Sequence, residues 1–141
     1  MKCLMGLDVG ERRIGVAVSD ELLLTAQGVC VIESRGTKKD IEQIGLLIKE
    51  KGVTHLVLGL PRNMNGSLGP MAEKVQDFGR QLSEKNPEVQ LSYWDERLTT
   101  SAAQRTLVEA DVSRRRRRQV VDKVAAVLIL QGYMDAHCRQ N

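Results

Sequence analysis

The chain has 141 residues, a net charge of +3 and a pI of about 8.9. Its residues are 42% hydrophobic and 28% charged, which is ordinary for a globular protein and excludes a disordered, collagen-like or coiled-coil chain. No apolar run approaches the roughly 20 residues that cross a bilayer, and Asp8 follows the N-terminus too closely for a secretory signal. We therefore expect one cytoplasmic domain over residues 1–141 that does not associate with membranes.

The first third of the chain is predicted to form three strands, over residues 3–9, 14–19 and 25–33. The first two are mainly apolar runs, and the turn that begins at Gly10 between them is short. A strand, a short turn and a second strand are typical of an antiparallel hairpin. We therefore expect the sheet to begin with antiparallel strands.

The rest of the chain alternates between helices and strands. Helices are predicted where apolar residues recur at helical spacing or a capping motif stands, and strands where apolar residues are continuous. The expected elements are a helix that ends at Gly52, a strand over 55–60, a helix over 71–82, a strand over 89–94, a helix that begins at Ser101 and a helix over about 119–136. This order predicts an α/β fold with a five-stranded mixed sheet, in which the first three strands are antiparallel and helices cover both faces.

Acidic residues stand in three unusual places. Asp8 lies inside an apolar strand, Asp95 and Glu96 end the last strand, and Asp122 lies near the start of the apolar final helix. Each one taken separately is compatible with a helix cap or an arginine partner, but sites in α/β sheets gather beyond the carboxyl ends of strands. Clustered carboxylates repel each other unless a cation binds them, and Mg²⁺ binds carboxylates together with substrate phosphates. The pattern therefore predicts metal-assisted phosphodiester hydrolysis, typically by two ions about 4 Å apart.

Basic residues accompany these acids along the chain, and we expect them to bind nucleic acid. Such contacts give affinity for phosphates but little sequence preference. The run of five arginines is expected in a loop before the final helix, where a solvated, flexible connector is the alternative interpretation. The candidate nucleic-acid-binding residues are Arg12, Arg13, Arg62, Asn63, Arg97, Arg114, Arg115, Arg116, Arg117, Arg118 and Lys123.

Four motifs resemble those of one family, in the family's order and over nearly the whole chain. Residues 6–20 resemble the opening motif of the YqgF (RuvX) family, and Gly59-Leu60-Pro61 with Asn65-Gly66 resembles its central loop. Residues 95–100 resemble its D-E-R-x-T-T motif, and residues 122–131 resemble its final helix. The resemblance implies an RNase H-like fold and a Mg²⁺- or Mn²⁺-dependent nuclease that processes the 5′ end of pre-16S ribosomal RNA.

The resemblance also implies which residues are catalytic. Asp8 and Asp122 match the family's first and last acids, and Asp8 would bridge the two metal ions. Better-known resolvase relatives carry the middle acid on the fourth strand, which has no acid in this chain. We expect Glu96 to replace it, with Asp95 as the alternative, because Glu96 is nearer the strand end and has the longer side chain. Since adjacent strand residues point to opposite faces, we expect only one of the two to serve.

The same resemblance suggests that Arg13 and Lys123 steady the phosphate that is cleaved. Two other functions stay open. One is the resolution of four-way DNA junctions, which is an older assignment of the family through its kinship with RuvC and requires a dimer of definite geometry. The other is a nucleic-acid-binding factor without catalysis, in which the acids are structural. Because no dimer face is evident in the sequence, we expect a monomer or a weak homodimer.

Overall fold

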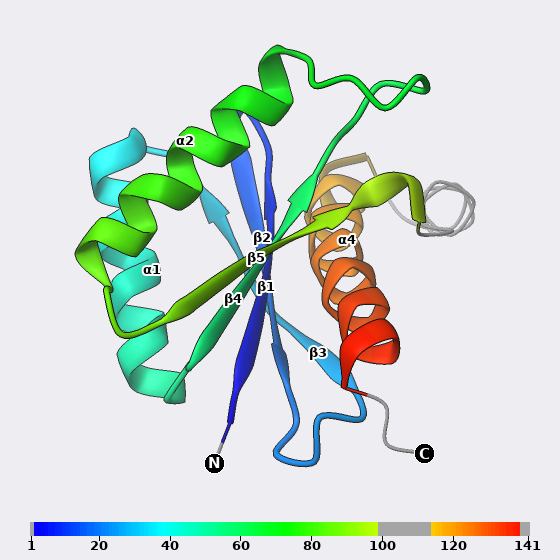
Figure 1. Cartoon of the computed structure of the whole chain (residues 1–141). Coiled ribbons are helices and arrows are strands. Elements are labelled where there is room, and N and C mark those ends of the chain that lie inside the picture. Colours follow the sequence, from blue (N-terminus) through cyan, green and yellow to red (C-terminus); the bar gives the residue numbers. More distant parts are fainter. Residues whose placement is uncertain (1, 99–113, 139–141) are drawn as a thin grey trace.

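A mixed sheet of five strands, in the order β3-β2-β1-β4-β5, forms the centre of the molecule (Figure 1). The structure is a computed structural model that describes residues 2–98 and 114–138, with side chains up to Arg97 and from Lys123 onward. The strands are β1 (Leu4–Val9), β2 (Arg13–Ser19), β3 (Ala26–Glu33), β4 (His55–Leu60) and β5 (Gln90–Asp95). The first three pair antiparallel, whereas β4 is parallel to β1 and to β5, which confirms the predicted sheet.

Helices cover both faces of this sheet, as predicted (Figure 1). Helices α1 (Thr37–Lys51) and α2 (Pro70–Lys85) lie on one face, and α4 (Arg114–His137) lies on the other. Helix α1 ends at Gly52, which adopts the left-handed conformation with φ of 66° that favours glycine at this position. The helix predicted to begin at Ser101 lies outside the described residues.

Helix α4 begins at Arg114, five residues earlier than the predicted start at 119. The prediction placed the arginine run in a loop before the helix, and this was wrong. Arginine is among the better helix formers, and the apolar middle of the helix is anchored on the sheet, so that its first turns can extend into the charged run. The backbone of the five arginines thus belongs to the N-terminal end of α4.

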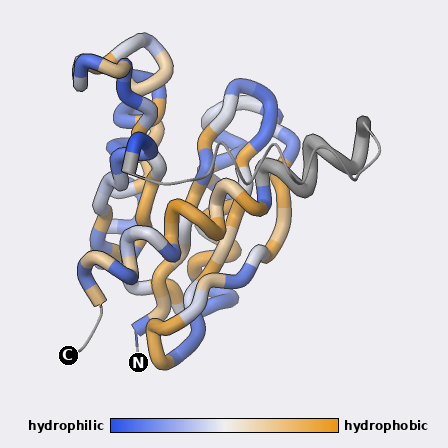
Figure 2. The backbone as a smooth tube through the Cα atoms, turned by 90° about the vertical axis from the view of Figure 1, so that its right-hand side faces the viewer, coloured by the Kyte–Doolittle hydropathy of each residue, from blue (hydrophilic) through white to orange (hydrophobic). Residues whose placement is uncertain are grey.

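Each face of the sheet has its own hydrophobic core. In β1, Met5, Leu7 and Val9 pack in the cluster with α1 and α2, whereas Leu4 packs in the cluster with α4. Figure 2 shows that hydrophobic residues are concentrated along the central strands. Because side chains alternate along a strand, Asp8 lies on the α4 face with Leu4.

Helix α4 approaches β1 closely because the strand has a glycine there. A Cβ atom at Gly6 would lie 2.7 Å from Cβ of Leu130 and 2.9 Å from the carbonyl oxygen of Ala126. Farther along α4, the ring of Tyr133 contacts His55 at the beginning of β4. The helix therefore runs antiparallel to β1 and β4, and its N-terminal part lies beyond the carboxyl ends of these strands. Among the described residues, no helix has both the length and the apolar character needed to span a membrane.

Candidate functional site

Two of the expected acids, Asp8 and Glu96, lie at the carboxyl ends of parallel strands. Asp8 is the last residue but one of β1, and Glu96 follows β5 as the first residue of a short 3₁₀ helix (Glu96–Leu98). Both are half-buried. They come from strands that are separated in the sheet by β4.

Glycines flank Asp8 on both neighbouring strands. Asp8 pairs with Gly15 of β2, and the parallel register that pairs Leu7 with Leu58 places Gly59 of β4 on its other side. The carboxylate of Glu96 leans over Gly59, since its Oε1 lies 2.8 Å from the position that a Cβ atom would take there. Neighbouring strands are about 4.8 Å apart. The two carboxylates therefore share the α4 face, and no side chain of β4 stands between them.

The role of Gly59 was not predicted from the sequence. The sequence shows that the fourth strand has no acid. It does not show that a glycine in this strand makes room for the acid that follows the neighbouring strand β5. A Cβ atom at this position would lie 2.4 Å from Cδ1 of Ile129. A glycine inside a continuous apolar strand often marks such a close approach, and this was the available signal.

Asp122, the third expected acid, lies in α4 one turn before Ala126. Because Ala126 packs on Gly6 and the helix runs antiparallel to β1, the backbone of Asp122 lies toward the end of the strand that carries Asp8. Its side chain is outside the described part of the chain. Among the side chains that are described, no group of three His, Cys, Asp or Glu residues could hold a metal ion.

Asp95 points away from the other acids. Tyr93 of the same strand donates a hydrogen bond to the carbonyl oxygen of Gln76 in α2, so by alternation Asp95 lies on the α2 face. Its carboxylate accepts hydrogen bonds from Nε and Nη2 of Arg97, the shortest at 2.7 Å, and lies 3.9 Å from Nε of Arg62. The hydrogen bond from Arg97 lowers the pKa of Asp95 below its ordinary value.

A compact loop (residues 61–69) connects β4 to α2 beside this ion pair. The backbone N–H of Asn63 donates to the carbonyl oxygen of Ser67, and the N–H of Gly66 donates to that of Asn63, at 3.0 and 2.8 Å. The Nδ2 of Asn63 also donates to the hydroxyl of Ser67. Asn63, an expected nucleic-acid contact, therefore contributes to the order of the loop, and exposed Met64 stands at the tip, 97% accessible.

The remaining basic candidates surround the same end of the sheet, with one exception. Arg12 is exposed in the β1–β2 hairpin, and Arg13 shares the face of Asp8, because it lies two residues before Gly15. The arginine run of residues 114–118 begins α4, whose side chains are described only from Lys123. The stem of Lys123 lies over Gly28 of β3, near the opposite edge of the sheet.

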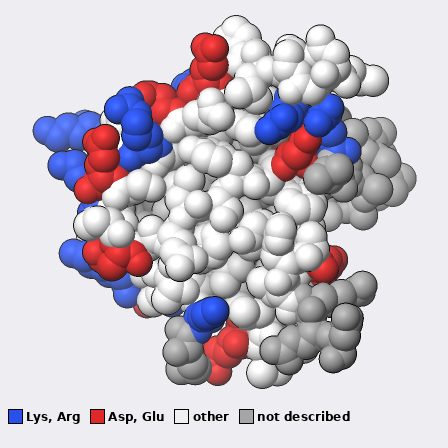
Figure 3. All heavy atoms as spheres, in the orientation of Figure 1, with Lys and Arg blue, Asp and Glu red and all other residues white. Residues whose placement is uncertain are grey.

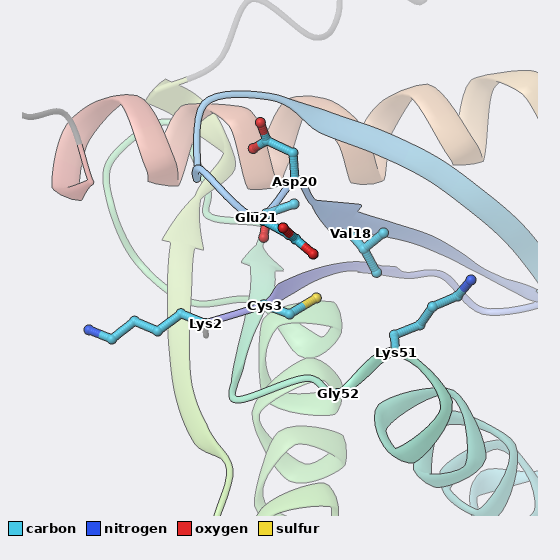
Figure 4. Close-up of a pocket in the computed structure, with 8 residues that line it drawn as sticks. Lys2, Cys3, Val18, Asp20, Glu21, Lys51 and Gly52 are labelled. Carbon is cyan, nitrogen blue, oxygen red and sulfur yellow. The ribbon is translucent and has the colours of Figure 1, made fainter.

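The opposite end of the sheet holds a hollow of about 410 Å³ (Figure 4). Lys2, Cys3, Glu21 and Lys51 are among its lining residues, and burial raises the pKa of the Cys3 thiol. Positive and negative side chains are both present there. This hollow contains none of the acids that the sequence analysis selected.

His55 belongs to a structural cluster at the beginning of β4. Its Nε2 lies 2.8 Å from the hydroxyl of Ser92, and its ring makes an edge contact with Tyr133. Burial lowers the pKa of His55, and the charge of Lys2 contributes to the shift. The histidine therefore stabilises the packing of α4 on the sheet.

Comparison with known proteins adds sequence relatives over nearly the whole chain. A family model described as RuvX, Holliday junction resolvase, matches residues 2–136. A relative from Clostridioides difficile is 57% identical over 94% of this chain and 93% of its own length. Relatives from Heliobacterium modesticaldum and Natranaerobius thermophilus are 56% and 53% identical, over 94% and 98% of this chain and 89% and 97% of their own lengths. All three carry the name "Putative pre-16S rRNA nuclease".

Solved structures with a similar fold come from two resolvases. Thermus thermophilus RuvC in complex with a Holliday junction substrate has a TM-score of 0.60 at 11% identity, over 96% of both chains. The Fowlpox virus resolvase with Holliday junction DNA has a TM-score of 0.55 at 11% identity, over 97% of this chain and 99% of the other. At this identity the likeness shows the fold, and it confirms the expected RNase H-like fold.

Proposed function

The chain belongs to the RuvX family, and we propose that it is a metal-dependent nuclease that processes the 5′ end of pre-16S ribosomal RNA. One observation supports this proposal most strongly. The carboxylates of Asp8 and Glu96, from distant parts of the sequence, share one face of the sheet beside the bare backbone of Gly15 and Gly59. The names of the sequence relatives supply the RNA substrate.

The donor set fits hard divalent cations. Two half-buried carboxylates at strand ends offer oxygen ligands, which Mg²⁺ and Mn²⁺ prefer. Asp8 from the central strand β1, Glu96 after β5 and Asp122 from α4 would hold the ions. Ions bound there would activate the attacking water and stabilise the leaving oxygen of the phosphodiester.

Glu96 is the preferred middle ligand, and Asp95 is not. The carboxylate of Glu96 leans toward the strand of Asp8, whereas that of Asp95 lies on the α2 face and is already bonded to Arg97. A carboxylate held by a guanidinium is a poorer metal ligand, because binding the ion would break those hydrogen bonds.

The basic residues at this end would bind the substrate backbone. Arg12, Arg13, Arg62 and Arg97 lie near the ends of the strands that carry the acids, and residues 114–118 form the start of α4. Together these arginines would draw in a polyanion and contact its phosphates. Arg13 shares the face of Asp8 and is suited to steady the cleaved phosphate. Lys123, over Gly28, would contact the substrate farther away.

The proposal is tested by cleavage of RNA that spans the pre-16S 5′ leader, in the presence of Mn²⁺. We expect the wild-type protein to cut the leader and Asp122→Asn to lose this activity while it still binds RNA. Asp135→Asn is the matched control, because Asp135 is exposed at the other end of the same helix. Equal cutting by the wild type and Asp122→Asn would contradict the proposal.

Resolution of four-way DNA junctions is the second candidate, and the description of the matching family model favours it. It requires two active sites in a dimer of definite geometry, because two strands are cut symmetrically. Junction DNA belongs in the same substrate panel, with the mass of the complex measured by light scattering. Cleavage of junctions by a dimer, without cleavage of the RNA leader, would favour this function. Binding of RNA without cleavage of any substrate would leave a non-catalytic binding factor.

A further inference from the structure

Asp95, the last residue of β5, lies against the side chains of two arginines, Arg62 and Arg97. Arg97 donates from Nε and Nη2 to both carboxylate oxygens at 2.7–3.1 Å, and its backbone N–H donates to Oδ1 at 2.9 Å. The side chain of Asp95 is 18% exposed, whereas those of Arg62 and Arg97 are 37% and 40% exposed. Figure 3 shows basic side chains around an acidic one near this end of the molecule. The carboxylate is thus mostly covered, and the side chains of the two arginines are more exposed than it is.

The two guanidinium groups have N–H donors that Asp95 does not use. Each guanidinium has five such donors in one plane. Asp95 accepts from two nitrogens of Arg97, while Nη1 of Arg62 donates to the carbonyl oxygen of Gly66 at 3.4 Å. Two positive charges against one negative charge leave a net positive group. Paired guanidinium groups with free donors are well suited to a phosphate.

The β4–α2 loop holds this group in place. Gly66 has a φ of 86°, which favours glycine, and a Cβ atom there would lie 3.5 Å from Nη1 of Arg97. Arg62 is itself part of the loop, and its backbone pairs with that of Leu68 in an isolated antiparallel β-bridge. The loop therefore lies close to Arg97 on one side while Asp95 binds it on the other, which restricts the orientation of the guanidinium plane.

We propose that Asp95 is a positioning residue that holds Arg62 and Arg97 as a clamp for a substrate phosphate next to the one that is cleaved. This inference rests on the proposed function, because it takes Glu96 and not Asp95 as the metal ligand. Asp95 and Glu96 point to opposite faces at the end of β5. A nucleic-acid strand that is cut beside Glu96 would therefore cross the edge of the sheet to reach the clamp. The substrate class is therefore a polynucleotide with consecutive phosphates, and an isolated phosphodiester is a poor substrate.

The test compares Asp95→Asn with Glu96→Gln in the full chain. For Asp95→Asn we expect the KM for leader RNA to rise about tenfold, as when a charged hydrogen bond is removed, with little change in kcat and in Mn²⁺ affinity. The salt dependence of RNA binding should also weaken, by about 0.7 in the slope for each phosphate that the variant no longer binds. Asp95→Glu, which keeps the charge, should restore part of the KM. On a dinucleoside monophosphate, which has no flanking phosphate, Asp95→Asn should lose less activity than on RNA.

Asp77→Asn is the matched control, because Asp77 on α2 is also bonded to an arginine, Arg80, but is exposed on a helix surface. It should leave the KM and the salt slope unchanged. Loss of Mn²⁺ affinity in Asp95→Asn, as large as in Glu96→Gln, would overturn the proposal, and so would an unchanged KM. If the wild-type protein cleaves no substrate, the proposed function fails. RNA affinity of Asp95→Asn, measured by fluorescence anisotropy, then still decides whether the clamp exists.

Discussion

The two ends of the sheet use polar residues in different ways. At the end where β1 begins, Oδ1 of Asp20 accepts the backbone N–H groups of Leu24 and Thr25, and the hydroxyl of Ser19 accepts that of Leu4. These bonds close a hairpin and join neighbouring strands. At the end where β1 finishes, Asp8 and Glu96 lie on one face beside glycines, and Arg13 shares that face. Polar residues at the first end therefore stabilise the fold, whereas we propose that those at the second serve catalysis.

The largest effect is expected for the acids at the carboxyl ends of the strands. Asp8→Asn or Glu96→Gln would remove a metal ligand that contributes several kcal/mol to stabilisation of the transition state. This energy corresponds to a loss of kcat of about 100-fold or more. Since both changes keep the size of the side chain, the melting temperature without metal should change far less than kcat. Single-turnover kinetics and thermal unfolding measure both effects. A variant with a much lower melting temperature and a normal cleavage rate would show that these acids stabilise the fold and do not serve catalysis.

A substitution at Gly59 should affect both stability and catalysis. Gly59→Ala would place a methyl group 2.4 Å from Cδ1 of Ile129 and 2.8 Å from Oε1 of Glu96. Overpacking of this kind costs about 1–3 kcal/mol, and the displaced carboxylate would lower kcat. Calorimetry and cleavage assays measure the two losses.

Gly45→Ala is the control for this substitution, since no atom lies within 4 Å of a Cβ atom at this position in α1. It should stabilise the protein by up to about 1 kcal/mol without a change in cleavage. An unchanged kcat in Gly59→Ala would argue against the position of the Glu96 carboxylate over Gly59 as part of the site.

At the opposite end, the expected change is confined to stability. Asp20→Ala would leave the N–H groups of Leu24 and Thr25 without their present acceptor, at a cost of about 1 kcal/mol. Urea unfolding should show this loss, while kcat/KM for RNA stays at the wild-type value. A fall in kcat/KM larger than the fall in the folded fraction would erase the distinction between the two ends.

The smallest effect is the pH dependence that His55 contributes. Burial lowers the pKa of folded His55, so that the unfolded chain takes up a proton near pH 6.5 before the folded chain does. The stability from this group is present above that pH and is lost as the pH falls below it. We expect a lower melting temperature at about pH 5 than at pH 7, and a weaker decrease in His55→Gln. Equal slopes for both proteins would assign the decrease to other groups.

Much of the fold could be predicted from the sequence, because the patterns are local. Continuous apolar runs indicate the strands, and Gly52 and Pro87 mark the ends of α1 and α2. The arginine run was placed wrongly, because the helix was predicted from its apolar residues, and the run has none. Tertiary packing decides where α4 begins, and no local sequence pattern predicts this residue.

The candidate site could be predicted only in part. Alternation along a strand predicted that Asp95 and Glu96 point to opposite faces, and the structure places the two carboxylates so. The choice of Glu96 rested on its longer side chain and its place at the strand end, and it stays a prediction. The glycines beside Asp8 were not foreseen, because strand neighbours depend on the register of the sheet. The contact of Arg62 with Asp95 has the same origin, since the β4–α2 loop and β5 meet only in the folded chain.

The most direct test of the central claim is a calorimetric titration of Mn²⁺ into the wild-type protein and into Asp8→Asn. If the carboxylates at the ends of β1 and β5 hold the ions, the affinity of the variant for Mn²⁺ should fall more than about tenfold. Loss of a residue that only hydrogen-bonds a metal ligand already lowers metal affinity by about that much. Equal affinities for Mn²⁺ in the two proteins would contradict a metal site at this end of the sheet.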